Sequence, residues 1–214
     1  MKDKKFTTKN QISRGYGANR KTPYAALRVI KKWAKSNNVA IAFVSVFVVV
    51  YIVSQCTEDA FLYLGTTGIN NLNGEYYRWF TCLFLHYNLR HLLANSIALL
   101  VVGYLLAPFL KKRQTLFLFL SGGMLSEIAF SAVCTGQIYD IGASGGIFAL
   151  LACLIVCHLR YPEKSQFPWY RPDVLFILLY FVFANSSTSA FLVHSFGFTA
   201  GILISFLMVS AGLC

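Results

Sequence analysis

Long apolar segments alternate with shorter polar ones along most of this chain. Several of the apolar segments approach the roughly 20 residues that an α-helix needs to cross a bilayer. We place six such segments at about residues 39–55, 80–108, 115–133, 142–158, 173–184 and 190–213. The pattern predicts an all-α fold, that of a polytopic membrane protein with six transmembrane helices.

The polar stretches predict the rest of the organisation. Residues 1–37 are polar and basic, which predicts a partly disordered tail, and residues 38–214 then form one membrane domain. Within the tail, apolar residues recur at helical spacing over 24–35, which fits an amphipathic helix on the membrane surface or an unstructured approach to the first span. The connection after the first span is about 25 residues long and includes the apolar run 61–64, and loops of this length are often functional or partly embedded.

Composition and charge support the membrane class and restrict the partners. The chain is 57% hydrophobic and 13% charged, and its mean hydropathy is +0.58. The net charge of +11 could indicate a nucleic-acid partner, but 11 of the 19 Lys and Arg residues precede Ser36 and six more lie at 111–113 and 160–171. Basic residues confined to alternate loops follow the positive-inside rule. We therefore expect contact with membrane lipid, no nucleic acid, cytoplasmic N- and C-termini, and a place in the cell membrane.

The six cysteines have neither metal-ligand nor disulfide-framework spacing. Cys153 and Cys157 lie one helical turn apart and are interpreted as packing residues. Cys56 and Cys134 could both face the outside, which leaves a disulfide between them open. The N-terminus lacks the pattern of a signal peptide, because its basic region is too long. No metal or cofactor is expected.

Polar side chains inside the apolar segments are the candidates for chemistry, because such positions are costly for polar groups. Ser144 lies in the fourth segment and His194 in the sixth, while His91 and Asn95 share one helix face in the second, just after His86. All five lie in the outer half of the predicted membrane domain. A serine needs a base such as histidine to become a nucleophile, and amide and imidazole N–H groups can stabilise an oxyanion. The set predicts acyl-transfer chemistry.

Small residues around the serine and the histidine would let their two helices pack closely. Gly142 and Gly145 flank the serine, and Gly197 and Gly201 follow the histidine at the spacing of tight helix contacts. Each motif alone is weak, but together, at one depth, they favour a Ser-His dyad. Glu127, the only carboxylate within a span, is interpreted as a protonated or paired structural residue.

Four motifs, at 75–81, 86–95, 142–145 and 194–201, resemble in order and spacing the rhomboid family of intramembrane serine proteases. The resemblance runs from about residue 39 to the end of the chain. It implies the basic six-helix form with a half-embedded first loop. It also implies an endopeptidase that cleaves transmembrane protein substrates without a cofactor.

The resemblance implies a role for each candidate residue. Ser144 would be the nucleophile and His194 its base. His91 and Asn95, with the backbone N–H of Ser144, would line the oxyanion hole, and His86 would support the site. The four glycines named above are supporting residues through the close packing that they allow, independently of the resemblance.

Two positions depart from the family pattern. The usual Trp-Arg pair of the first loop reads Tyr77-Arg78, and this arginine is expected to hold the loop. A tyrosine often found four residues after the nucleophile is Phe148, which keeps the ring that can stack on the imidazole and loses the hydroxyl.

Two other functions stay open on the sequence. A catalytically inactive relative could bind membrane proteins and escort them, although such relatives lose the serine or the histidine. A small-solute transporter could use the polar layer as its pathway, although transporters tend to show internal repeats and this chain shows no convincing one.

Overall fold

The computed structural model describes residues 31, 33–57, 59–136, 138–164, 177, 179–180, 184 and 187–213. Within these ranges the chain is helical, with one isolated β-bridge. The long helices are α2 (Asn38–Gln55), α5 (Leu89–Leu106), α6 (Lys112–Val133), α7 (Ser144–Arg160) and α9 (Thr188–Ser210). The short ones are α3 (Ala60–Leu64), α4 (Arg78–Thr81) and three 3₁₀ turns, at Ile69–Asn71, Cys82–Phe84 and Pro162–Lys164. The predicted all-α class is confirmed for this part of the chain.

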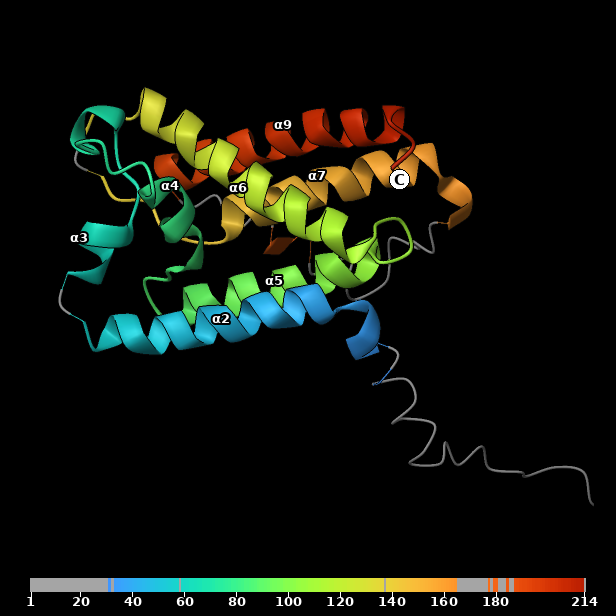
Figure 1. Ribbon diagram of the computed structural model, residues 1–214, viewed down its shortest axis with the longest axis horizontal. Coiled ribbons are helices and arrows are strands. Elements are labelled where there is room, and N and C mark those ends of the chain that lie inside the picture. Colours follow the sequence, from blue (N-terminus) through green and yellow to red (C-terminus); the bar gives the residue numbers. More distant parts are fainter. Residues whose placement is uncertain are drawn as a thin grey trace, which may run out of the picture.

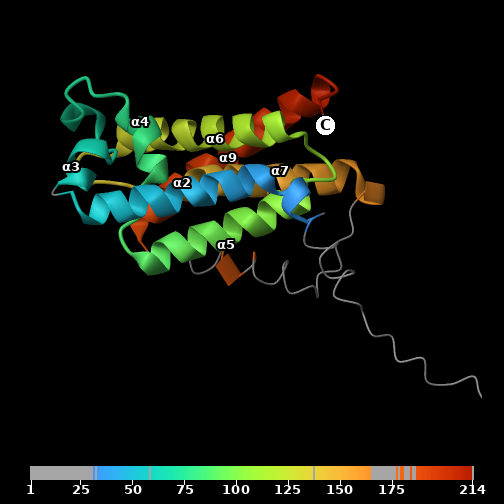
Figure 2. The ribbon, with the colours of Figure 1, turned by 60° about the horizontal axis from the view of Figure 1, so that its bottom comes forward.

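The long helices run alongside one another, with α3 and α4 gathered at one end of the molecule (Figures 1 and 2). Helix α7 packs against α5, α6 and α9, and α2 packs against α5. The Gln114 amide donates a hydrogen bond to the carbonyl of Leu213, so the start of α6 and the end of α9 lie at the same end. This is the end opposite α3 (Figure 1).

Four of the described helices, α2, α5, α6 and α9, are long and apolar enough to cross a membrane. Helix α7 is apolar but shorter, at 17 residues, and most of its residues are buried among the other helices. This arrangement is consistent with a polytopic membrane protein. The predicted fifth span, 173–184, falls almost entirely outside the described residues, as does most of the predicted amphipathic helix at 24–35.

The predicted second span began at residue 80, and the structure corrects this boundary. Helix α4 and a 3₁₀ turn occupy 78–84, residues 85–88 are not helical, and α5 begins only at Leu89. Asn88 is the reason, because its backbone is extended (φ −158°, ψ 170°) and its side chain accepts a 2.9 Å hydrogen bond from the His91 N–H. This is the geometry of a helix N-cap. His86 therefore lies in a loop and not on the helix that carries His91.

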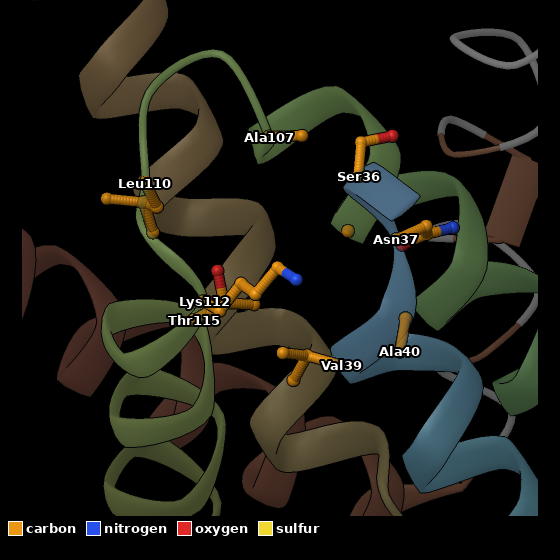
Figure 3. Close-up of a pocket in the computed structure, with 9 residues that line it drawn as sticks. Ser36, Asn37, Val39, Ala40, Ala107, Leu110, Lys112 and Thr115 are labelled. Atoms are coloured by element: carbon orange, nitrogen blue, oxygen red, sulfur yellow. The ribbon is translucent and has the colours of Figure 1, made fainter. Parts of the chain in front are cut away.

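Asn37, the residue before α2, forms a hydrogen bond to α5. The Asn37 amide nitrogen donates a 2.8 Å hydrogen bond to the carbonyl of Leu100. A Cβ atom at Gly103 would lie 2.7 Å from the Asn37 side-chain oxygen and 3.2 Å from Ala40, so the absence of a side chain there permits the close approach. Lys112, at the start of α6, lies beside this contact (Figure 3).

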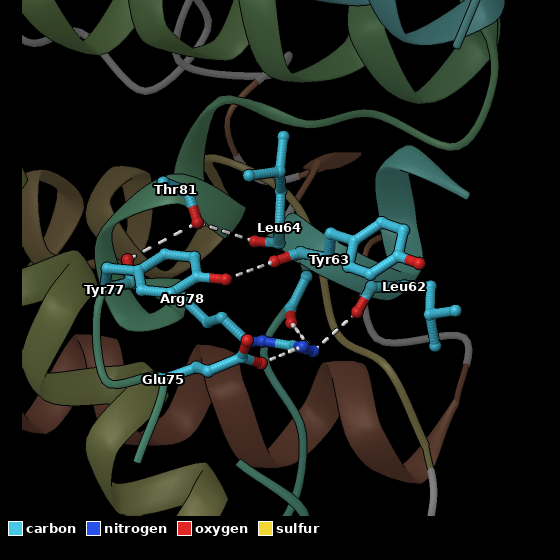
Figure 4. Close-up of polar contacts among 8 residues, drawn as sticks. Leu62, Tyr63, Leu64, Glu75, Tyr77, Arg78 and Thr81 are labelled. Carbon is cyan, nitrogen blue, oxygen red and sulfur yellow. Dashed lines mark hydrogen bonds and ion pairs between the residues drawn. The ribbon is translucent and has the colours of Figure 1, made fainter. Parts of the chain in front are cut away.

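The connection after α2 is held by a buried arginine, as predicted. The Arg78 guanidinium donates to the carbonyl oxygens of Leu62, at 2.5 Å, and Gly65, at 3.5 Å, and forms an ion pair with Glu75 (Figure 4). The Thr81 hydroxyl donates a 2.7 Å bond to the carbonyl of Leu64. These bonds satisfy carbonyl groups of the short helix α3 that have no partner within it. They fix the loop against α4, which is followed by the 3₁₀ turn at Cys82–Phe84 and then by the loop that carries His86.

Candidate active site

A cavity of about 480 Å³ brings the predicted catalytic residues together. Ser144, His194, His91 and Asn95 all line it, although they come from three different helices. His86 is not part of its lining. The cavity is bordered by α5, by the segment that precedes α7, and by the start of α9.

Ser144 is placed by the extended turn that leads into α7. It is the first residue of that helix and is 8% exposed. Two residues earlier, Gly142 has a φ of +135°, which L side chains rarely adopt, and its N–H donates a 2.9 Å bond to the carbonyl of Cys82. The glycine thus allows the chain to turn sharply, so that the serine faces the cavity at the helix N-terminus.

His194 lies over the same face of α7. Its ring stacks on Phe148 with 4.2 Å between ring centroids and 7° between the planes. Because Phe148 is four residues after Ser144, both side chains point from one face of the helix. The predicted stacking on the imidazole is confirmed.

Glycines make the close approach of α7 and α9 possible. A Cβ at Gly197 would overlap the carbonyl oxygen of Gly145, and one at Gly201 would overlap the carbonyl oxygen of Ala149. Gly145 itself leaves room for the Ser126 hydroxyl of α6. The predicted small-residue contact between the two helices is therefore present, and its direct partners are backbone atoms.

His91 and Asn95 reach the turn before the serine. The position that a Cβ of Gly142 would occupy lies 2.9 Å from His91 Nε2 and 3.4 Å from Asn95 Nδ2. Asn95 is only 1% exposed, and its Oδ1 accepts a 2.7 Å hydrogen bond from the hydroxyl of Tyr180. His91 Nε2 and Asn95 Nδ2 thus lie close to Gly142, two residues before Ser144.

His86 stands behind His91. It is fully buried, and its ring centroid lies 5.1 Å from that of Phe47 and 5.1 Å from that of His91, which it meets edge to face. A buried ring in this position can support His91 but is not part of the cavity lining.

Sequence reasoning missed three side chains of the cavity. Tyr87 stacks on His91 with 6.1 Å between centroids, and its hydroxyl donates to the carbonyl of Tyr139. Asp140 is half-buried at the cavity edge, and burial raises the pKa of its carboxyl to about 7. Tyr180 contacts Asn95 from 85 residues away. Of the three, only Asp140 could have been suspected from the sequence, because it is an acidic residue just four positions before Ser144.

The remaining polar candidates lie away from the cavity. Glu127 is fully buried in α6, and neither of its oxygens has a hydrogen-bond partner among the described residues. Cys56 and Cys134 are free thiols, so the disulfide left open on the sequence is absent. Cys153 and Cys157 are buried in α7, as expected for packing residues. No group of three metal-binding side chains occurs in the part of the chain that the structure describes.

Comparison with known proteins decides the family, because the model of the Rhomboid domain matches residues 73–211. The chain belongs to the rhomboid family. The matched region includes α4, α5, α6, α7 and α9, and with them every residue of the site above. As a rhomboid protein with four helices of spanning length, it is an integral membrane protein that passes the membrane several times.

Three relatives show the range of the family. The putative rhomboid protease YdcA of Bacillus subtilis is 29% identical over 141 residues, which cover 64% of this chain and 69% of that protein. The uncharacterized protein Rv1337 of Mycobacterium tuberculosis is 32% identical over 155 residues, or 68% and 61% of the two chains. The human inactive rhomboid protein 2 is 26% identical over 134 residues, or 62% of this chain and 16% of that protein. The chain thus spans less than two thirds of the last two relatives.

Proposed function

We propose that this rhomboid protein is an intramembrane serine endopeptidase that cleaves transmembrane-helix substrates with a Ser144–His194 dyad. The observation that carries the proposal is the single cavity lined by Ser144, His194, His91 and Asn95. A nucleophile, a base and two N–H donors around one space are the parts that acyl transfer requires. The family match adds support.

The proposed reaction uses the dyad twice. The Ser144 hydroxyl oxygen attacks the scissile carbonyl carbon while His194 takes its proton. The carbonyl oxygen becomes an oxyanion, which accepts hydrogen bonds from the side chains of His91 and Asn95 and from the Ser144 N–H. His194 then gives the proton to the leaving amine, the C–N bond breaks, and an acyl-enzyme remains. A water molecule then attacks the ester carbon while His194 takes its proton; the C–O bond to Ser144 breaks, and His194 returns the proton to the serine oxygen.

Two features of the surroundings suit this role. Phe148 holds the plane of the His194 ring, so the imidazole keeps one orientation across both steps. The Ser144 N–H belongs to the first turn of α7, where backbone N–H groups have no partner within the helix and point along the positive end of its dipole. Such a group is a preformed donor for the oxyanion.

The orientation in the membrane is part of the proposal. Basic residues 111–113 precede or begin α6, and Gln114 of that first turn bonds Leu213 near the C-terminus. Asn37, which follows the basic tail, lies at this same end beside Lys112 (Figure 3). By the positive-inside rule, these contacts support cytoplasmic termini. A location in the cell membrane, with lipid and transmembrane proteins as partners, completes the proposal.

An inactive binding or escort protein is the second candidate, favoured by the similarity to the human relative named inactive. A cleavage assay separates the two functions. The purified protein in detergent would be incubated with a generic transmembrane-helix substrate, beside Ser144→Ala and His194→Ala. Ser121→Ala, a serine on the α6 surface, is the matched control. The proposal requires cleavage by the wild type and by the control only, and binding without cleavage by the wild type would support the escort function.

A further inference from the structure

Of the two polar atoms of the buried Asn95 side chain, the oxygen has a hydrogen-bond partner among the described residues and the nitrogen has none. Its Oδ1 accepts the 2.7 Å hydrogen bond from Tyr180, whereas its Nδ2 has no hydrogen-bond partner among the described residues. The nitrogen lies on the side of Gly142, beside the cavity that contains Ser144. A buried donor without a protein partner carries a desolvation cost. Its position therefore suits a group that acquires a partner during the reaction.

The direction of the carboxamide decides whether Asn95 helps or hinders. With Nδ2 toward Gly142, the amide can donate to an oxyanion in the cavity. If the amide turned by 180° about its last side-chain bond, Oδ1 would face that oxyanion, and two acceptors would repel each other. The bond from Tyr180 occupies Oδ1 and so stabilises the donor-forward direction. It also polarises the amide, which strengthens the N–H as a donor.

We propose that Tyr180 is a positioning residue for the oxyanion hole and acts through Asn95. The inference rests on the proposed function, because it assigns Tyr180 a part in the same reaction. Tyr180 does not itself touch the reacting atoms in this account, since its hydroxyl proton is used in the bond to Asn95. Its contribution is the orientation of the donor.

The role of the Tyr180 hydroxyl can be tested separately from the packing of its ring. It lies 5.8 Å, between centroids, from the ring of Phe148, which in turn stacks on His194. Tyr180→Phe keeps that ring contact and removes only the oxygen that reaches Asn95. A packing role would survive this substitution, whereas a positioning role would not.

The test is a double-mutant cycle on the full-length protein in detergent, with kcat and KM measured on the transmembrane substrate. The four proteins are the wild type, Tyr180→Phe, Asn95→Ala and the double variant. Tyr180→Phe should lower kcat roughly 10-fold, less than the 10²–10³-fold typical for loss of a donor itself, and leave KM unchanged. In the Asn95→Ala background the same substitution should have no further effect, because the group that it positions is gone.

The control is Tyr104→Phe, which removes a hydroxyl from the outer surface of α5 and should leave kcat and KM unchanged. If Tyr180→Phe cleaves the substrate with a normal kcat, and this cleavage depends on Ser144, the inference about Tyr180 is wrong and the proposed function stands. An equal loss in both backgrounds, which would mean that Tyr180 acts independently of Asn95, or a change confined to KM, would have the same consequence. Absence of Ser144-dependent cleavage in the wild type would instead overturn the proposed function, and the inference with it.

Discussion

Phe148 and His194 lie ring on ring, 4.2 Å apart and within 7° of parallel, at the contact between α7 and α9. The stacking fixes one helix's aromatic side chain against the other helix's proposed base. Since Phe148 and Ser144 are one turn apart on α7, it also sets the imidazole over the face that carries the serine.

Loss of this ring should therefore impair the reaction, in addition to the loss of stability expected when a buried phenylalanine is truncated. Phe148→Ala is expected to lower kcat by up to about 10²-fold, the cost typical of a displacement of about 1 Å in a catalytic group. Phe148→Tyr should retain activity, because the ring is kept. Steady-state cleavage rates, normalised to folded protein, check this. Full activity in Phe148→Ala would show that the stacking does not orient His194.

Asn95→Ala should reduce turnover without abolishing it. Removing one preorganised oxyanion donor costs about 10²–10³ in rate, and we expect the smaller end because His91 and the Ser144 N–H remain. The measurement is kcat beside a melting curve. A lowered melting temperature with unchanged kcat would make Asn95 a packing residue and leave the oxyanion hole to the other donors.

The contact between α7 and α9 should not tolerate a larger residue at Gly201. A Cβ there would overlap the backbone of Ala149, and neither helix can move without disturbing the site. Gly201→Ala should lower the free energy of unfolding by about 1–3 kcal/mol, as overpacking does. Denaturant titration in detergent measures it. Gly136→Ala, where the nearest atom to the new Cβ lies at an ordinary 3.6 Å, is the control and should be close to wild type.

Asp140 predicts a pH dependence of stability. Because burial raises the pKa of its carboxyl from 3.8 to about 7, the folded protein binds this proton more tightly than the unfolded chain does. The free energy of unfolding should therefore fall as the pH rises from about 4 to about 7 and show no further contribution from Asp140 above that range. Glu127 and Tyr87 also face Asp140, so the comparison needs a variant.

That variant is Asp140→Asn, which cannot ionise. Its melting temperature should decline less than that of the wild type between pH 4 and pH 7, and the two curves should differ most at the upper end. Asp59→Asn, at an exposed carboxylate, serves as the control and should follow the wild type. Parallel curves for Asp140→Asn and the wild type would remove Asp140 as the cause.

Much of this site could be predicted from local patterns. Ser144 and His194 stand out because polar groups in apolar segments need a reason, and Gly197 and Gly201 because small residues four apart indicate a helix contact. The start of α5 was predicted wrongly. The apolar residues before Leu89 were read as part of the span. Asn88, a residue type that commonly caps helix N-termini, was the sequence signal that α5 begins at Leu89.

Other parts of the site had no local signal. Tyr180 and Asn95 meet across 85 positions of sequence, and one tyrosine in an apolar run does not reveal what its hydroxyl reaches. The edge-to-face contact of His86 with His91 likewise depends on the loop that replaces the first turns of the predicted span. Both contacts arise from tertiary packing, which periodicity and spacing do not encode.

The central claim, that His194 activates Ser144 for nucleophilic attack, is tested most directly by the rate at which a fluorophosphonate labels the protein. The account predicts a single adduct on Ser144, located by peptide mass spectrometry. It should be absent in Ser144→Ala and form far more slowly in His194→Ala, with cleavage lost on the order of a million-fold in either variant, because the two residues act as a unit. Labelling of Ser144 at the wild-type rate in folded His194→Ala would contradict the account.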